Sequence, residues 1–213
     1  APLQGITDFS FRTVFGRHFQ GFDSALAPFI HTVASERVSS RHVRDILAQN
    51  NPSLSVEPQL LGNTPSHFLT VCHYLADRGF ESVNWNLGCP SPTVTKKSKG
   101  SALLSHPDRI RSFLDKVIPS LPLDLSIKTR LGFHRNDELL RLLPFLNSYP
   151  LKNIVIHPRT GKQMFQGAID EEMFAHCLRL SEHRIIYNGD IFTATAFSRV
   201  AKLFPEIHGW MIG

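Results

Sequence analysis

The chain has 213 residues, of which 42% are hydrophobic and 19% are charged, a composition typical of a globular protein that buries a core. It contains no run of about eighteen apolar residues and opens without a signal peptide, so we expect no membrane-spanning helix and a cytoplasmic protein. The net charge of +5 favours polyanionic partners, RNA among them.

The cysteines and histidines do not form a recognisable metal site. Cys72, Cys89 and Cys177 make no CxxC pair, and the eleven histidines show no HExxH motif or zinc-type spacing. An odd number of unpaired thiols suits a reducing compartment better than a disulfide scaffold. The sequence therefore predicts neither a bound metal nor disulfides.

Short apolar runs alternate with longer amphipathic segments along the chain. We expect strands, in chain order, over residues 1–3, 24–28, 54–59, 82–86, 124–128, 153–157, 185–188 and 209–212. We expect helices over residues 9–19, 65–77, 107–118, 137–146, 171–180 and 193–203. Thr64 and Pro65 mark the start of the second helix, and Pro144 is expected to distort or shorten the fourth. In the first helix, Phe11 and Phe15 lie close to one face.

Eight strands that alternate with helices predict parallel pairing and a (β/α)8 TIM barrel, forming a single domain over residues 1–213. A doubly wound open sheet is the alternative. It is less favoured because no GxGxxG or GxxxxGK[ST] turn follows any of the strands. We expect the chain to stop directly after the eighth strand, so that it is a barrel fragment. The alternative is a natural barrel with seven helices.

Polar residues follow the predicted strands at their carboxyl ends, where barrels of this type hold their active sites. The lysine, arginine, histidine and amide side chains found there favour a flat, anionic ligand. Gly189 and Gly213 follow the last two strands, the position at which barrels bind phosphate. Flavin mononucleotide (FMN) has both properties. Cys89 follows the fourth strand, although a free cysteine is more often an inert buried residue.

Six blocks of sequence carry a resemblance to a known family. They are residues 1–8 with Phe11 and Arg12; 59–62; 86–90 with Gly100, Leu103 and Leu104; 128–132; 157–160 with Gln163 and Gly167; and 188–191 leading to 211–213. In these blocks the chain resembles the tRNA-dihydrouridine synthases, FMN enzymes that reduce a uridine in tRNA. The family continues beyond the barrel with a helical domain that grips tRNA, which we expect to be absent from this chain.

The resemblance implies a role for each matching residue. Cys89 is expected to give a proton to C5 of uracil while reduced FMN delivers hydride to C6, with NADPH as electron donor. The residues expected to bind the cofactor are Pro2, Leu3, Gln59, Lys128, His157, Asn188, Gly189 and Gly213. Those expected to contact the uridine or the RNA are Asn86, Lys96, Lys97, Lys99, Arg130 and Arg159. The protein is expected to be a monomer.

Several alternatives stay open at this point. Gln59 and Asn86 are also typical of buried amides that tie loops together. The lysines between residues 96 and 99 are equally typical of a solvated face. The chain is also compatible with a truncated barrel that binds FMN or RNA with little turnover, or with a flavin reductase of a free pyrimidine.

Overall fold

The computed structural model describes residues 1–32, 34, 38 and 43–213. The strands β2 (Ile30–His31), β4 (Gln59–Leu61), β5 (Ser82–Leu87), β6 (Asp124–Gly132), β7 (Leu151–Thr160), β8 (Ile185–Tyr187) and β9 (Gly209–Trp210) form a seven-stranded sheet in this order. All of its neighbouring strands are parallel. A second sheet pairs β1 (Ser24–Leu26) with β3 (Ser55–Glu57), also in parallel.

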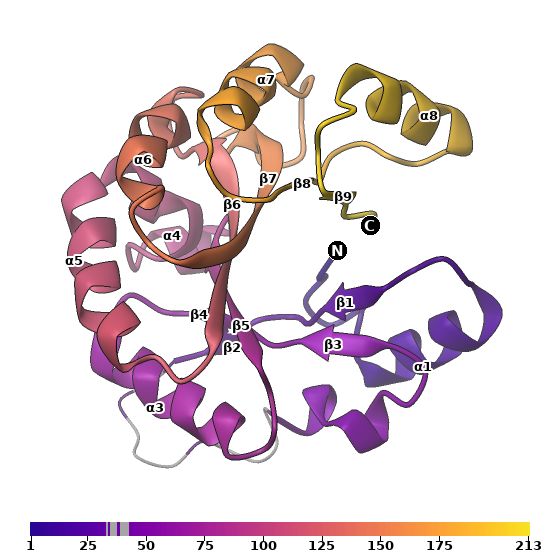
Figure 1. The fold of residues 1–213 in the computed structure, drawn as a ribbon, viewed down its shortest axis with the longest axis vertical. Helices are drawn as coiled ribbons and strands as arrows, with labels where there is room; N and C mark the ends of the chain where they lie inside the picture. The colour runs from indigo at the N-terminus through magenta and orange to yellow at the C-terminus, as the bar shows by residue number, and fades with distance from the viewer. Residues whose placement is uncertain (33, 35–37, 39–42) are drawn as a thin grey trace.

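The two sheets are consecutive parts of one wall. Only Pro58 separates β3 from β4, and a proline has no N–H to continue a ladder. The ladder nevertheless bridges the gap, because the Asn84 N–H donates to the Pro58 carbonyl at 2.8 Å and the Ala27 N–H donates to the Glu57 carbonyl at 3.0 Å. The strands therefore curve as one barrel wall, as Figure 1 shows at the centre of the molecule.

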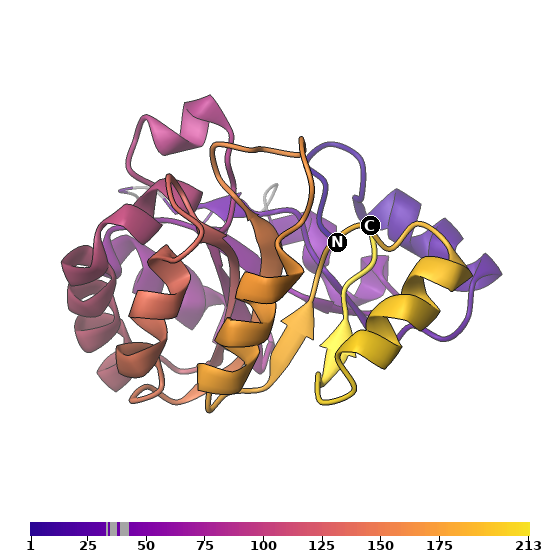
Figure 2. The ribbon, with the colours of Figure 1, turned by 90° about the horizontal axis from the view of Figure 1, so that it is seen from above.

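The predicted first strand over residues 1–3 was wrong. The Leu3 carbonyl instead accepts hydrogen bonds from the N–H groups of Ile6 and Thr7, each at 3.0 Å, which turns the chain directly into the first helix. The two ends of the chain meet where the wall comes round: the amino group of Ala1 donates to the Ile212 carbonyl, and in the described residues no strand pairing joins β9 to β1 or β2. Figures 1 and 2 both show the two termini beside each other. The predicted TIM-barrel type of fold is confirmed.

Helices cover the outside of the wall. They are α3 (Pro65–Ala76), α5 (Pro107–Val117), α6 (Glu138–Leu146), α7 (Glu171–Leu180) and α8 (Ala194–Leu203), with short turns α4 (Pro92–Thr95), η3 (Gly100–Ser105) and η4 (Ile118–Ser120) between them. Asp170 and Thr193 cap α7 and α8 through their side chains. Thr64 occupies the N-cap of α3 without a side-chain cap bond. Pro144 does not shorten α6, which continues to Leu146.

The strands alternate between an apolar outer side and a polar inner side. On the outer side of β5, the Trp85 ring is fully buried and stacks on Phe113 of α5, with 4.1 Å between ring centroids. Asn84 and Asn86 lie on the opposite side of the same strand and are buried as well. The main core therefore lies between strands and helices, and the barrel interior holds polar side chains together with a few apolar ones, such as Leu61 and Val155.

Helix α1 (Phe9–His18) is attached differently. Asp8 caps it by accepting from the Phe11 N–H at 3.0 Å, and Arg12 is its one buried residue. The short helices η1 (Arg44–Ile46) and η2 (Ala48–Asn50) lie against it through that arginine. The face that carries Phe11 and Phe15 is not covered by the core: the Phe11 side chain is 44% exposed. In the described ranges no helix combines the length and apolar character needed to span a bilayer.

Candidate active site at the carboxyl ends of the strands

Cys89 lies just beyond β5 in a backbone that is fixed from both sides. Its N–H donates to Asn86 Oδ1 at 2.8 Å, and the Gly88 N–H donates to the same oxygen at 3.1 Å. Its carbonyl accepts from both the N–H and the hydroxyl of Ser101, each at 3.0 Å. The thiol therefore sits on a segment whose amide and carbonyl groups are all held by neighbouring residues.

Gly100 is needed for this arrangement. It has a φ of +59°, in the left-handed region that favours glycine, and a Cβ there would lie 2.5 Å from the Cys89 carbonyl oxygen. No side chain fits this space without moving the cysteine. The turn between α4 and η3 can pass so close to Cys89 only because this residue is glycine.

The Cys89 thiol is half-buried, and burial raises its pKa above the ordinary value. A hydrogen bond from the backbone at Ser91 and the positive charges of Arg130 and Lys128 act in the opposite direction. Because burial has the larger effect, the thiol keeps its proton at neutral pH. That protonation state suits a proton donor and does not suit a nucleophile.

Lys128 and His157 lie on β6 and β7 beside the cysteine, on strands that pair directly. Burial, with a contribution from Arg130, lowers the pKa of Lys128 to about 7. Within the described residues the Lys128 ammonium makes no hydrogen bond or ion pair to the protein. A ligand with a negative charge or strong acceptor atoms would therefore satisfy this group.

His157 is neutral at physiological pH. Burial, followed by the charges of Arg130, Lys128 and Arg159, lowers its pKa to about 3. Its Nε2 atom lies 3.4 Å from an N–H group of Arg159. Because a guanidinium can only donate, Nε2 is the acceptor nitrogen and the proton of the ring is on Nδ1.

Gln59 and Asn86 were predicted to touch a ligand, or alternatively to tie loops together. Gln59 is fully buried, and both ends of its amide are bonded, to Asn84 and to Asn86. Asn86 is 7% exposed and uses its oxygen to hold the turn at Cys89. The structure thus describes the tying role for both residues, and contact with a ligand stays a prediction.

Arg130, on β6, bonds to the segments that follow the neighbouring strands β5 and β7. Its guanidinium donates to the carbonyls of Gly88 at 3.0 Å, Thr160 at 2.9 Å and Met164 at 2.5 Å, and the side chain is buried. It also lies over the Phe165 ring, 5.2 Å from the centroid. Arg130 therefore attaches the loop after β7 to the turn that precedes Cys89.

Arg159 is held in a similar way but is neutralised. It makes a two-pronged ion pair with Asp190, at 2.8 and 2.6 Å, and donates twice to the Gly167 carbonyl. The hydrogen bonds and positive charge of Arg159 hold the pKa of Asp190 below its ordinary value. Since the guanidinium groups of Arg130 and Arg159 are engaged within the protein, a contact of either with RNA stays a prediction.

The lysine segment between α4 and η3 lies next to the cysteine turn. Lys96 and Lys97 are exposed, whereas burial and the charge of Lys97 lower the pKa of the half-buried Lys99. Asn63 holds the segment by donating to the carbonyls of Lys97 and Ser98. Two of the three predicted lysines therefore point their charge to solvent at the rim of the site.

The predicted phosphate end lies at the seam where the chain termini meet. Asn188 donates to the Met211 carbonyl at 2.7 Å, which joins the ends of β8 and β9. A Cβ at Gly213 would lie 2.5 Å from the Cβ of Ala1, so the two ends of the chain are in close contact. Gly189 packs against Pro158. Pro2 is half-buried and Leu3 is exposed beside this seam.

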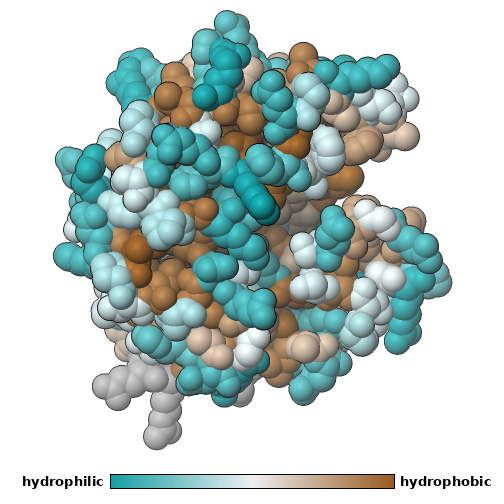
Figure 3. Space-filling model, in the orientation of Figure 1, coloured by the Kyte–Doolittle hydropathy of each residue, from teal (hydrophilic) through white to brown (hydrophobic). Residues whose placement is uncertain are grey.

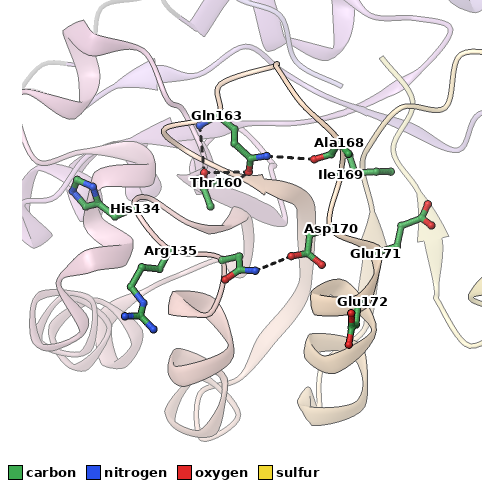
Figure 4. Close-up of a pocket in the computed structure, with 10 residues that line it drawn as sticks. His134, Arg135, Thr160, Gln163, Ala168, Ile169, Asp170, Glu171 and Glu172 are labelled. Carbon is green, nitrogen blue, oxygen red and sulfur yellow. Dashed lines mark hydrogen bonds between the residues drawn. The ribbon is translucent and has the colours of Figure 1, made fainter.

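A hollow of about 740 Å³ lies to one side of the cysteine, between the starts of α6 and α7. Figure 4 shows that some of its polar side chains meet: Asn136 donates to Asp170, and Gln163 donates to the Ala168 carbonyl, whereas Arg135, Glu171 and Glu172 point away from them. Of its charged groups, Arg135 pairs with Asp137 and Glu171 pairs with Arg199, whereas Glu172 is exposed to solvent. We therefore place the candidate site at the strand ends and not in this hollow.

Ser101, Asn84 and Asp190 were not predicted from the sequence, although each holds a residue of the site in place. The signal for Asn84 was present, because Asn84 and Asn86 are two positions apart on one strand and therefore share a face. Asp190 follows Asn188 and Gly189 directly. Ser101 had no local signal, since its bond to Cys89 depends on how η3 packs. Among the described residues no cluster of metal-binding side chains is found.

Comparison with known proteins adds the following. The family model for dihydrouridine synthase (Dus) matches residues 1–213. A protein of Rhodobacter capsulatus named probable tRNA-dihydrouridine synthase is 29% identical, covering 100% of this chain and 65% of its own length. tRNA-dihydrouridine synthase B of Pasteurella multocida is 28% identical over 91% of this chain and 58% of its own length. A probable tRNA-dihydrouridine synthase of Staphylococcus aureus is 29% identical over 100% and 66%. The chain thus spans less than two thirds of the length of these relatives.

Proposed function

The chain belongs to the dihydrouridine synthase family, and on this premise we propose that it reduces the C5–C6 double bond of uridine in tRNA with FMN as cofactor. The observation that carries the proposal is Cys89: a protonated, half-buried thiol on a fixed turn, beside Lys128, which has no ion-pair partner among the described residues. The names of the similar proteins support the same substrate and product.

The residues at the strand ends fit an anionic flavin. Lys128 offers an ammonium that no protein group neutralises in the part of the chain described, and neutral His157 offers one donor and one acceptor. Asn188, Gly189 and Gly213, with Pro2 and Leu3, would line the end toward the phosphate. When bound and reduced, FMN supplies the hydride for C6 of the uracil ring, and NADPH is the proposed source of electrons.

Cys89 would complete the reaction by giving its proton to C5. Burial keeps that proton on sulfur until the transfer, and the clamp on the backbone keeps the sulfur in one place. The thiolate left behind would be stabilised by Lys128 and Arg130, whose positive charges favour the ionised form of this cysteine. The same two cations thus support the second half of the reaction.

The surface around the site would hold the RNA. Lys96 and Lys97 are exposed at the rim and would pair with phosphates near the target uridine. Arg159 would act mainly by ordering the loops, since all three of its nitrogens donate to Gly167 or Asp190. Arg130 orders the loops through Nε and Nη1, and its Nη2, which donates to no group among the described residues, would be the part of the side chain left for the RNA. A uracil must leave its stack to reach Cys89, as in other enzymes that act on a base.

The proposal can be tested in two steps on the purified protein. The visible spectrum after loading with FMN and desalting should show bound flavin. The loaded protein, with NADPH, should then form dihydrouridine in an unmodified tRNA transcript and not in free uracil. A protein that retains no flavin would contradict the proposal. Reduction of free uracil alone would favour a free-pyrimidine reductase instead.

A cysteine variant sharpens the assignment. Cys89→Ala should retain flavin but lower dihydrouridine formation by about two to four orders of magnitude, the usual contribution of a general acid. Cys177→Ala is the matched control, because this thiol is buried in α7 away from the site. Unchanged turnover in Cys89→Ala would remove this residue from the mechanism.

A further inference from the structure

A continuous chain of hydrogen bonds runs through the barrel interior below Cys89. Asn86 Nδ2 donates to Gln59 Oε1 at 2.9 Å, and Gln59 Nε2 donates to Asn84 Oδ1 at 2.8 Å. Asn84 Nδ2 then donates to the Ser126 hydroxyl at 2.7 Å, and that hydroxyl donates to Glu57 Oε1 at 3.0 Å. We name this chain from Asn86 to Glu57 the interior relay.

The members of the interior relay come from four strands: Glu57 ends β3, Gln59 begins β4, Asn84 and Asn86 lie on β5, and Ser126 lies on β6. Register explains their meeting, because Gln59 lies opposite Asn84 and Asn84 lies opposite Ser126. Gln59, Asn84 and Ser126 are fully buried. A barrel interior is more often filled by branched apolar side chains, so this polar filling requires an explanation.

Glu57, at the lower end of the interior relay, can only accept hydrogen bonds. An ionised carboxylate has no proton to give, so the Ser126 hydroxyl must direct its proton to Glu57. The oxygen of Ser126 is then free to accept from Asn84, which places the amide nitrogen of Asn84 toward the serine and its oxygen toward Gln59. The Asn84 oxygen in turn needs a donor, so the Gln59 nitrogen lies toward Asn84 and the Gln59 oxygen lies toward Asn86.

The backbone groups that meet the upper end of the interior relay can only donate hydrogen bonds. The backbone N–H groups of Gly88 and Cys89 both point at Asn86 Oδ1 and can bond to nothing but an acceptor. The two ends therefore demand the same orientation of every amide between them. Chains of aligned hydrogen bonds also strengthen one another in a buried setting.

From this geometry we infer that Glu57 is a positioning residue for Cys89: its carboxylate anchors the interior relay and thereby fixes the Asn86 oxygen that holds the cysteine turn. The inference deepens the proposed function and rests on it for the role of Cys89. Glu57 lies outside the site, at the other end of the barrel interior, where Lys152 approaches its Oε1 atom at 3.8 Å. Lys152 also donates to Ser82 at 2.9 Å.

The reactivity of the Cys89 thiol reports on this arrangement without flavin or RNA. Cys72 and Cys177 are fully buried, so alkylation by iodoacetamide, followed by mass spectrometry, reads the half-buried Cys89. Glu57→Met removes the acceptor at nearly the same size, and Ser126→Ala removes the next member of the relay. Each should speed alkylation of Cys89 by about three- to tenfold, the effect of losing one net hydrogen bond.

Three comparisons separate the relay from a general loosening of the fold. The double variant Glu57→Met/Ser126→Ala should alkylate no faster than the faster single variant, because both changes break one chain. Glu57→Gln keeps an acceptor oxygen and should stay within about twofold of the unmodified protein. Glu171→Met is the matched control: it removes a partly buried carboxylate that pairs with Arg199 away from the relay, and it should not change the rate.

Additive effects of the two single variants, or a Glu57→Met rate equal to that of the unmodified protein, would overturn the inference. If Glu57→Met does not fold, Ser126→Ala compared with Glu171→Met decides the same question. The side-chain amide signals of Gln59 and Asn86 in nuclear magnetic resonance spectra give a second reading, since they should shift in Ser126→Ala and not in Glu171→Met. A failed tRNA assay would contradict the proposed function and leave these results unchanged.

Discussion

Helices α5 and α1 both carry regularly spaced apolar side chains, but they use them in opposite ways. In α5 the spaced residues Ile110, Phe113 and Leu114 are buried against the strands. In α1 the spaced aromatic residues face outward, and the buried residue is Arg12. Figure 3 shows that the surface is indented between the parts that Figure 1 labels α8 and α1.

The comparison shows that two parts of the barrel are stabilised by different forces. Around β5 and β6 the helices are attached by apolar burial, with Trp85 and Phe113 stacked at its centre. Around α1 the attachment is a polar cluster, in which Arg12 bonds to Asn51, to the Thr7 carbonyl and to Asp45. The half that carries Cys89 is therefore the one supported by the main core.

The largest expected effect is in the core half. Phe113→Ala should lower the free energy of unfolding by about 3–5 kcal/mol, because it leaves a cavity beside Trp85. Phe11→Ala is the counterpart on α1 and should cost less than about 1 kcal/mol, since that ring is exposed. Urea denaturation measures both. Equal losses would mean that α1 contributes to the core in the same way as α5.

A substitution in the polar cluster around Arg12 should have the next largest effect on the free energy of unfolding. Asp45→Asn leaves the buried Arg12 charge without its carboxylate and should cost about 2–3 kcal/mol. Hydrogen exchange should then increase in α1 before it increases in α5. Asp137→Asn, which breaks an exposed pair with Arg141, is the control and should cost less than about 1 kcal/mol. A uniform rise in exchange over both helices would contradict the division into two parts.

Two glycines with similar backbone angles sharpen the contrast further. Gly100→Ala should cost about 2–3 kcal/mol, because its left-handed φ is unfavourable for alanine and the new Cβ would strike the Cys89 carbonyl. Gly5→Ala has a φ of +78° but no atom within 4 Å of the new Cβ, so only the backbone term of about 1 kcal/mol remains. The difference in unfolding midpoints isolates the close contact at the cysteine.

The smallest expected effect depends on pH. The pKa of Lys128 is lowered to about 7 in the folded protein, so the unfolded chain holds a proton between about pH 7 and 10 that the folded chain has released. Folding is then penalised most below pH 7, and the penalty fades as the pH rises through that range. Lys128→Met should stabilise the protein at pH 6 by about 1–2 kcal/mol and less at pH 9. A gain that is constant with pH would show that Lys128 is not strained by its charge.

Most of the fold was predictable because its signals are local. Pro65 and Pro107 begin helices, and alternating residues in β5 separate an apolar side from a polar side. The failures have a physical cause as well. Periodicity predicts an apolar face but not whether another element covers it, as the partly exposed face of α1 illustrates. The segment over residues 1–3 has the composition of a strand, yet its carbonyls are used in a turn.

The site was predictable as a set of residues but not as a set of contacts. The polar residues that end the strands were identified, and the register brings Gln59, Asn86 and Lys128 onto neighbouring strands as expected. Which of their atoms are already occupied could not be read from the sequence, because the partners are distant in the chain. Arg130 illustrates this, since its bonds to Gly88 and Met164 join residues more than thirty positions apart.

The charge of Arg130 should also affect how fast a polyanionic ligand associates with the protein. Its Nε and Nη1 groups are bonded to carbonyls, which are neutral, so the positive charge of the side chain is held in place without a counter-charge among the described residues. Arg159, by contrast, has Asp190 as its counter-charge. A fixed, uncompensated charge at the mouth of the barrel extends a field into solvent and attracts a polyanion before any contact forms. Association with such a ligand should accordingly be fast at low ionic strength and slow steeply as salt is added.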